Sequence, residues 1–363
     1  MEIFSYLRTS DPTQWIDAEE RQNFCNLALV CRFFSSVMLP WIFENVKFIE
    51  KDSYSQISST HSSTVSAKFC RDVLDGDTTA LLLAKHVKRW AFSGSPTGSN
   101  WAPAFLSMYF ETLRYTSNLL ELSLSNITIP KDLFRRLSGV MTLESLKLDD
   151  CSLDETVLGK HLKHFESLSL KQFVLAHPVP CSDIGRLLLH LNLSSLIRLE
   201  LDIFPRLETL SLSDNCLPLE ELYLDIAVDP FQVVKFLEKT PHLNVLRVHC
   251  LPSIIDHPFT IKPHVIPRLT NINANRYICE QILPGRPISC LELAWPSTRE
   301  TNNVETLTCS TKPIVNLKLS WYRDGPPSWR HFPDLESLEI LVLNFQYCSW
   351  GEVCFLSFVI SKI

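Results

Sequence analysis

The sequence predicts an α/β fold in which short strands and return segments alternate and stack along one axis. Three observations support this prediction. Leucines recur in the order LxxLxL, successive copies follow at intervals of about 20–29 residues, and several of the intervening segments have helical patterns. This is the pattern of a leucine-rich-repeat solenoid, a horseshoe with a strand-lined inner face. One such unit cannot bury its leucines alone, so neighbouring units must stack.

Two segments match the repeat pattern in full. TLESLKLDDC gives LxxLxLxxC from Leu143, and RLETLSLSDN gives LxxLxLxxN from Leu207. Looser copies have their first positions at Val87, Leu119, Phe165, Leu196, Leu219, Leu243, Leu269, Ile288, Ile314 and Leu335.

The intervals between copies decide whether they form a repeat. From Leu119 onward, without the Leu207 copy, they are 24, 22, 31, 23, 24, 26, 19, 26 and 21 residues. Most of these intervals suit leucine-rich repeats. The Leu207 copy lies 11 residues after Leu196 and 12 before Leu219, too close for a strand plus its return. Either one of these two copies forms a strand on the outer side, or the register slips there.

Residues between the strand leucines should face outward, onto the concave side, because side chains alternate along a strand. We expect Tyr223, Arg247 and His249, with Lys147 and Glu221, to be the target-binding residues, since aromatic and arginine side chains dominate interface energies. The wider set of predicted concave positions is Glu121, Ser123, Ser145, Lys147, Ser167, Ser169, Glu221, Tyr223, Arg247, His249, Asn316 and Lys318.

Some of the return segments should be helical. APAFLSMYFETLRYTS has Phe105, Met108, Tyr109 and Leu113 on one side, and DPFQVVKFLEKTP starts with Asp229 as N-cap and Pro230 at the first helical position. The return LPSIIDHPFTIKPHVIP has too many prolines for a helix and should be extended or irregular.

The first fifty residues form a separate segment. NFCNLALVCRFFSSVMLPWIF has apolar residues at helical spacing, and we expect Pro40 to stop that helix before a short helix and strand in PWIFENVKF. The apolar surface exceeds what about fifty residues can bury among themselves, so part of it is a candidate partner surface. The predicted organisation is residues 1–50 as this helical segment, 51–80 as linker and helix, and 81–363 as the solenoid.

Several functional classes are excluded by the residues. The net charge of −6 and pI near 6.0 do not suit a nucleic-acid backbone. Phosphate-loop, dinucleotide, zinc-protease and serine-hydrolase motifs are missing, and His161 and His164 lack the further ligands of a metal site. Twelve cysteines without a CxxC pair, and no signal peptide or membrane span, indicate a reducing compartment, cytoplasmic or nuclear.

The segments EIFSYL and LALVCRFFSSVMLPWIFENVKF resemble an F-box in the form common in large fungal families. EIFSYL is similar to the end of the first F-box helix, LALVCRFF to its most recognisable stretch, and LPWIFENVKF to the tail that leads into the next domain. The Leu-Pro pair that normally precedes EIFSYL is missing, which implies an N-terminally truncated F-box. Because the apolar run CSWGEVCFLSFVISKI has no polar capping repeat, we expect truncation at the C-terminus also.

An F-box followed by leucine-rich repeats is the architecture of substrate receptors of SCF-type cullin–RING ubiquitin ligases. The resemblance implies a non-enzymatic receptor without a cofactor, which binds a Skp-type adaptor, and through it a cullin, and presents a target protein for proteasomal degradation. The adaptor-binding residues that it implies are Ile3, Phe4, Leu7, Leu27, Val30, Cys31, Pro40 and Trp41. The alternative is a leucine-rich-repeat scaffold outside any ubiquitin ligase. Its N-terminal helices would only cap the solenoid, with Leu27, Val30 and Trp41 buried against the first repeat.

Overall fold

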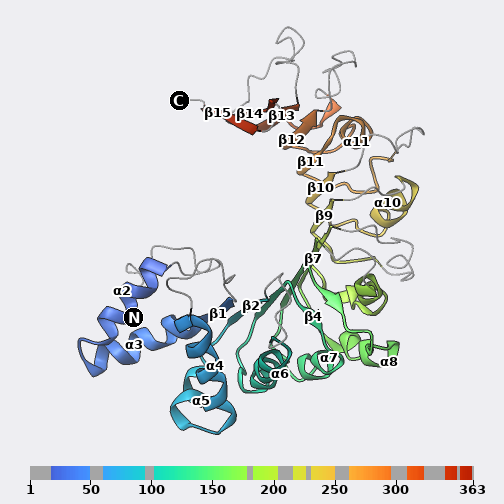
Figure 1. Cartoon of the computed structure of the whole chain (residues 1–363). Coiled ribbons are helices and arrows are strands. Elements are labelled where there is room, and N and C mark those ends of the chain that lie inside the picture. Colours follow the sequence, from blue (N-terminus) through green and yellow to red (C-terminus); the bar gives the residue numbers. More distant parts are fainter. Residues whose placement is uncertain are drawn as a thin grey trace. The chain divides into compact units, whose positions relative to one another are not determined.

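Short parallel strands alternate with helices and irregular returns in the computed structural model of the chain (Figure 1). The structure describes residues 18–49, 60–94, 102–177, 183–202, 216–225, 230–249, 261–295, 309–322, 340–349 and 352–361. These residues belong to two compact units, Met1–Asn192 and Leu193–Ile363, called unit 1 and unit 2 below. Among the described residues, no helix combines the length and the apolar character that a membrane span requires.

The main sheet of unit 1 is parallel. Its strands, in spatial order, are β1 (Asn45–Ile49), β2 (Arg89–Ser93), β3 (Glu121–Ser125), β5 (Ser145–Asp149) and β7 (Gln172–Ala176). A small second sheet pairs β4 (Thr128–Ile129) with β6 (Ser152–Leu153). Trp90, Leu122, Leu146 and Phe173 are neighbours in register, and each is at most 1% exposed. The predicted strands after Val87, Leu119 and Leu143 are therefore confirmed.

Unit 2 repeats the same arrangement. Its strands, in order, are β8 (Arg198–Leu201), β9 (Glu221–Asp225), β10 (Val245–His249), β11 (Asn271–Asn275), β12 (Cys290–Trp295), β13 (Asn316–Tyr322), β14 (Ile340–Ser349) and β15 (Glu352–Ser361). All pair in parallel except β14 and β15, which are antiparallel. Leu199, Leu222, Leu246 and Ile272 lie side by side in the register and are fully buried, as the repeat pattern predicts.

Eight of the described strands (β3, β5, β7 and β9 to β13) are each tied to the preceding strand by two backbone hydrogen bonds to one carbonyl. The amides of Leu120 and Glu121 both donate to the carbonyl oxygen of Lys88, at 2.8 and 3.0 Å. The amides of residues 144 and 145 donate likewise to the carbonyl of residue 120, and those of 171 and 172 to residue 144. In unit 2 the amides of 244 and 245 donate to residue 220, those of 270 and 271 to 244, and those of 289 and 290 to 270.

A left-handed residue follows three successive strands of unit 1. Asn126, Asp150 and His177 have φ values of 54°, 49° and 42°, and they come directly after β3, β5 and β7. Asparagine and aspartate tolerate this conformation better than most residues. The amides of Asn126 and Asp150 donate to the last carbonyl of the next strand, at 2.9 and 3.0 Å, so these turns extend the ladder. At the corresponding position after β2 the residue is Gly94, whose amide donates to Ser125.

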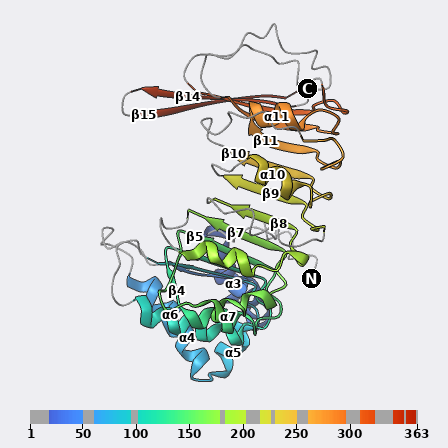
Figure 2. The ribbon, with the colours of Figure 1, turned by 90° about the vertical axis from the view of Figure 1, so that its right-hand side faces the viewer.

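Most helices lie on one side of the strands in each unit, whereas α2 (Ala18–Ala28) and α3 (Arg32–Glu44) lie beyond β1 (Figures 1 and 2). The other helices of unit 1 are α4 (Thr60–Leu74), α5 (Thr78–Ala84), α6 (Ala102–Thr112), α7 (Lys131–Leu137) and α8 (Gly159–Leu162), with 3-10 turns η1 (Leu113–Tyr115), η2 (Phe165–Ser167) and η3 (Asp183–His190). In unit 2 they are η4 (Leu193–Ser195), α10 (Pro230–Leu237) and α11 (Arg276–Ile282).

The two predicted return helices are present, and their apolar faces meet the strands. In α6 the ring of Tyr109 lies 4.5 Å from that of Phe48 and 5.1 Å from that of Phe92. Leu106 and Phe110 of α6 are buried, whereas Phe105 and Met108 are half-buried, so the inward face is rotated slightly from the predicted one. Helix α10 begins at Pro230 as predicted; its predicted N-cap, Asp229, lies outside the described residues.

The repeat predicted from Phe165 is wrong in register. Phe165 begins a 3-10 turn, and strand β7 begins only at Gln172. Phe173 pairs with Leu146, so this repeat reads from Leu170, with an aromatic residue at the first inward strand position. The prediction sought leucines at the inward strand positions, and it therefore started this repeat five residues too early. Ser167 and Ser169 consequently lie before the strand and not on its concave side.

The strand pairing also decides where two other predicted repeat copies start. The Leu196 copy supplies β8, where Leu199 pairs with Leu222, whereas the Leu207 copy lies outside the described residues. The copy predicted from Leu335 is three residues early, because β14 pairs Leu341, not Leu338, with Leu317.

The N-terminal helix prediction is also corrected. The apolar stretch forms two helices, since Leu29–Cys31 separates α2 from α3, and Cys31 has an extended backbone. Pro40 does not stop α3, which continues to Glu44. Proline removes one helical hydrogen bond, but Met38 and Ile42 are buried against α2, and this packing keeps the helix intact. The strand predicted after it is β1.

Candidate functional site

The helices α2 and α3 form a hairpin with a small core of its own. Phe24, Met38 and Ile42 are buried in that core. The rings of Phe24 and Trp41 meet edge to face at 5.3 Å. Because this core is internal to the hairpin, the turn between the two helices is not needed to cover the sheet.

An apolar patch lies at that turn. Leu29, Val30 and Phe33 are 85%, 67% and 60% exposed, and Cys31 between them is exposed too. Exposed apolar residues that lie together indicate a binding surface more strongly than scattered ones do. We call Leu29, Val30, Cys31 and Phe33 the hairpin patch.

The structure divides the predicted adaptor residues into three groups. Val30 and Cys31 belong to the hairpin patch, whereas Leu27, Pro40 and Trp41 are half-buried in or beside the hairpin core. Ile3, Phe4 and Leu7 lie outside the described residues. The scaffold alternative predicted that Leu27, Val30 and Trp41 are all buried against the first repeat, and Val30 is not. Leu29 and Phe33 were missed because the stretch was interpreted as one continuous helix.

A second candidate surface is the open face of each sheet, formed by the strand residues that alternate with the buried ones. In unit 1 these residues are Asn45, Lys47, Arg89, Ala91, Ser93, Glu121, Ser123, Ser125, Ser145, Lys147, Asp149, Gln172, Val174 and Ala176. In unit 2 they include Arg198, Glu200, Glu221, Tyr223, Val245, Arg247, Asn271, Asn273, Cys290, Glu292, Asn316 and Lys318.

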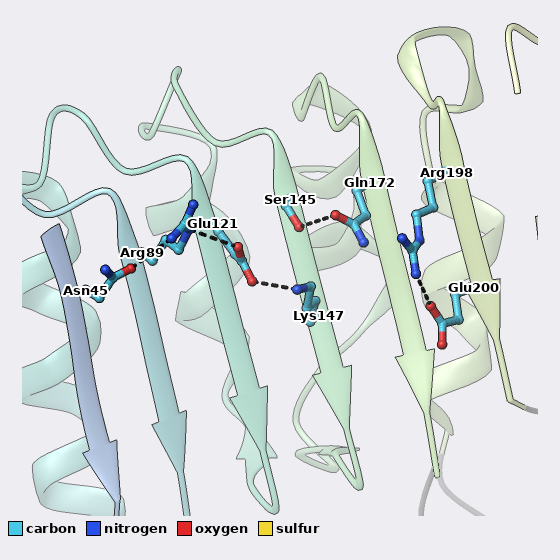
Figure 3. A network of polar contacts seen from close by, with 8 residues as sticks. All are labelled: Asn45, Arg89, Glu121, Ser145, Lys147, Gln172, Arg198 and Glu200. Carbon is cyan, nitrogen blue, oxygen red and sulfur yellow. Dashed lines mark hydrogen bonds and ion pairs between the residues drawn. The ribbon is translucent and has the colours of Figure 1, made fainter. Parts of the chain in front are cut away.

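On the open face of unit 1, polar side chains bridge from strand to strand (Figure 3). The carboxylate of Glu121 lies 2.7 Å from the ammonium of Lys147 on β5 and 3.5 Å from the Arg89 guanidinium on β2. Arg89 in turn donates a hydrogen bond of 3.2 Å to the amide oxygen of Asn45 on β1. One carboxylate thus fixes cations on both neighbouring strands.

The open face of unit 2 carries a different cluster, built around Tyr223. The Arg198 guanidinium lies 4.6 Å from the centre of the Tyr223 ring and contacts Glu200 at 3.1 Å and Glu221 at 3.4 Å. The phenol of Tyr223 donates to Glu221 at 3.3 Å. Partial burial, followed by the neighbouring carboxylate of Glu221, raises the pKa of Tyr223 above its usual value, so the phenol stays protonated as a donor. Arg247, beside Tyr223 in the register, is exposed.

The predicted target-binding residues are therefore partly assembled. Tyr223 and Glu221 contact each other in unit 2, with Arg247 on the next strand, and Lys147 belongs to the network of unit 1. The backbone of His249 lies at the end of β10; its side chain is outside the described residues. Arg89 and Arg198 were missed although they immediately precede the first inward residue of their repeats, which is the position of Glu121 and Glu221.

Metal ligation finds no support in the part of the chain that the structure describes, where no three metal-ligating side chains gather. The Nδ1 atom of His161 accepts a hydrogen bond of 3.0 Å from the amide of Leu158, at the start of α8. His161 therefore has a local structural role.

Comparisons with known proteins give only distant similarities. No protein-family model matches the sequence, and no curated protein matches it. The crystal structure of the yeast Rad7–Elc1 complex contains a chain with 14% identity and a TM-score of 0.45, over 90% of this chain and 83% of that chain. An internalin, InlF, of Listeria monocytogenes has 13% identity and a TM-score of 0.31, over 76% of this chain and 93% of that one. At such TM-scores neither similarity bears on function.

Proposed function

We propose that the chain is a protein-interaction module that acts as the substrate receptor of an SCF-type ubiquitin ligase. The hairpin patch binds a Skp-type adaptor, and the open faces of the strands bind a target protein. The chain contributes proximity and no chemistry, because holding a target near a charged ubiquitin-conjugating enzyme makes the transfer effectively intramolecular. It acts in the cytoplasm or nucleus.

The observation that carries this proposal is the exposure of the hairpin patch. Leu29 and Val30 lie at the tip of a hairpin whose core is complete without them. Burying a side chain of this size against a partner contributes roughly 1.5–3 kcal/mol. The F-box resemblance of LALVCRFF, which includes these two residues, supplies the identity of the partner.

The open faces support the second half of the proposal. They combine fixed charges with an arginine-stacked tyrosine at Arg198 and Tyr223, and Arg and Tyr are enriched among residues that dominate binding energy. Their side chains are held by neighbours across strands, so little conformational entropy is lost on binding.

Co-purification with a Skp-type adaptor tests the first half. The 363-residue chain should capture the adaptor, and the double variant Leu29→Asp, Val30→Asp should lose at least tenfold in affinity, because two carboxylates replace apolar contacts. Met141→Asp is the matched control: Met141 is 90% exposed elsewhere on unit 1, so this variant should bind like the wild type.

Circular dichroism on each variant separates lost binding from lost folding. Failure of the wild-type chain to capture any Skp-type adaptor would remove the ligase role and leave the scaffold alternative. Equal capture by the double variant and the wild type would show that the hairpin patch is not the contact.

A further inference from the structure

The open face of unit 2 carries a group of side-chain amides, which we call the amide stretch. It lies on β11, β12 and β13, which are neighbours in the sheet (Figure 1), and consists of Asn271, Asn273, Cys290 and Asn316. Among the described side chains on the open face of these three strands, the charged ones are Glu292 and Lys318, and they form an ion pair with each other. This part of the face is therefore polar and has no excess charge that would select a charged partner.

Two amides of the stretch have an unsatisfied atom. The side-chain oxygens of Asn273 and Asn316 are buried, and neither has a hydrogen-bond partner within the described part of the chain. The amide nitrogen of Asn316 donates to the sulfur of Cys290 at 3.3 Å, which is a weak acceptor. Exchanging the oxygen and nitrogen of either amide would leave the nitrogen unsatisfied instead. Because buried polar groups are rarely left unpaired, two of them in one stretch indicate that a bound ligand completes them.

The chemistry of the ligand follows from that of the amides. Asn273 and Asn316 are half-buried, and the broad terminal torsion of an asparagine side chain lets a small rotation bring the unsatisfied atom to the surface. Each amide then offers N–H donors and a carbonyl acceptor. A peptide unit of a main chain offers the same combination. The matching ligand is therefore a polypeptide segment whose main-chain groups are not already paired with one another.

A polyproline II segment meets this requirement, because this conformation has no internal hydrogen bonds. One turn of the segment takes three residues and advances about 9.3 Å, so the same side of the segment recurs at that interval. Adjacent strands of a sheet lie about 4.8 Å apart, and every second strand therefore recurs at about 9.6 Å. A polyproline II segment that crosses the strands would present equivalent groups to β9, β11 and β13 in turn.

The residues on these alternate strands suit such a segment. In one row across the sheet, Tyr223 on β9 is followed two strands later by Asn273 on β11. In the neighbouring row, Asn271 on β11 is followed two strands later by Asn316 on β13. Tyr223 supplies an aromatic surface of the kind against which proline-rich segments pack, and the Arg198 guanidinium, 4.6 Å from the ring centre, holds that ring in place.

We propose that the open face of unit 2 binds an uncharged, proline-rich segment of a partner protein, in the polyproline II conformation and laid across β9 to β13. Proline rings of the segment pack on Tyr223, and its main-chain groups pair with the amides of Asn273 and Asn316. The inference rests on the proposed role of the open faces as the target-binding surface, and it names the chemistry of the target.

Fluorescence anisotropy with the full chain tests the class of ligand. The probe is a labelled dodecapeptide of Pro-Pro-Ser repeats; dodecapeptides of Ala-Gly-Ser, Pro-Pro-Glu and Pro-Pro-Lys repeats are the comparisons. The Pro-Pro-Ser peptide should bind at least about fivefold more tightly than the Ala-Gly-Ser peptide, because a flexible chain loses more conformational entropy on binding. It should also bind more tightly than both charged peptides, and its affinity should change less than about twofold as salt increases.

Matched variants locate the binding. Tyr223→Ala should weaken it at least about fivefold, whereas Tyr223→Phe keeps the ring and should stay within about twofold of the wild type. Asn273→Leu with Asn316→Leu should weaken binding about three- to tenfold. The midpoint of urea unfolding of this double variant should stay equal or rise, because the unsatisfied buried atoms are removed. Gln281→Leu, on α11 at the other side of the strands, removes an amide outside the site and should change binding less than about twofold.

Each contrary result has a distinct meaning. Equal binding of the Pro-Pro-Ser and Ala-Gly-Ser peptides, or no binding of either, would overturn the polyproline II proposal, and tighter binding of a charged peptide would overturn the uncharged class. Unchanged binding in the Asn273, Asn316 double variant would remove the amides from the site, and a loss of its stability would assign them a structural role instead. Adaptor capture through the hairpin patch is measured separately. A chain that captures the adaptor but not the peptide refutes only this inference, and one that binds the peptide but not the adaptor refutes only the ligase role.

Discussion

Replacing Gly94 with alanine is expected to destabilise unit 1, because the backbone leaves no room for a methyl group. A Cβ atom built at Gly94 would lie 2.3 Å from the carbonyl oxygen of Asn126 and 3.0 Å from Cγ2 of Ile127. Ordinary carbon–oxygen contacts are about 3.3 Å or longer, so the two atoms must separate by about 1 Å. The oxygen belongs to a left-handed residue whose amide is bonded to Asp149 at 2.9 Å, so this shift distorts the turn and its ladder.

The expected net loss is about 1–2 kcal/mol. Overpacking of this kind costs about 1–3 kcal/mol, and alanine recovers about 0.4–1 kcal/mol by restricting the unfolded chain. Hydrogen exchange followed by mass spectrometry on peptides from β2 and β3 measures unit 1 directly, and urea unfolding gives the global effect. The variant should exchange about five- to thirtyfold faster in this region.

Gly159→Ala is the control, and its effect should have the opposite sign. Gly159 is the first residue of α8 and has no atom within 4 Å of an added Cβ. This variant should gain about 0.4–1 kcal/mol in stability. If Gly94→Ala protects β2 and β3 as well as the wild type does, or if both variants shift in the same direction, the steric reasoning is wrong.

Three further predictions concern unit 1. Leu146→Ala, at a fully buried register position, should cost about 2–5 kcal/mol in urea unfolding, and a loss below 1 kcal/mol would contradict the stacked core. Burial raises the pKa of the Cys151 thiol to about 11, so at pH 8 it should resist alkylation in the native chain while the exposed Cys31 reacts; equal labelling by mass spectrometry would argue against this difference. Hydrogen bonds from the Thr156 hydroxyl and amide lower the pKa of Asp154, so this contribution to stability is present above the unfolded pKa and lost as the pH falls through the lower folded value; an NMR titration midpoint at or above 3.8 would refute it.

The positions of the strands and of their inward residues were largely predictable from the sequence, because the buried leucines recur at regular spacing. The frame failed where another residue type fills an inward position: Phe173 takes the place of a leucine, and the strand β1 has Val46 and Phe48. A search guided by leucines identified the copy with Trp90 and Phe92 but misplaced or passed over these two. In contrast, burial in the core depends on apolar volume, and phenylalanine and valine supply it equally well.

The sequence predicted some individual residues of the candidate site but not the contacts between them. Tyr223 and Glu221 were identified from their alternation with buried leucines, but their contact with Arg198 depends on the register of a strand about twenty residues earlier. The hairpin patch was missed in part because the break at Leu29–Cys31 has no glycine or proline to announce it. Asn45 begins a strand without leucines, so no pattern placed it beside Arg89.

The paired backbone bonds that tie β3, β5, β7 and β9 to β13 to the strands before them have an evolutionary consequence. These bonds join main-chain atoms only, and every residue type has the carbonyl that accepts them. The start of a strand is therefore fixed independently of the side chains. A return segment can therefore gain or lose residues without sliding the strands past one another, as the differing intervals in this chain illustrate. Natural selection can exchange single outward side chains, and so alter what is recognised, while the rows they occupy stay aligned.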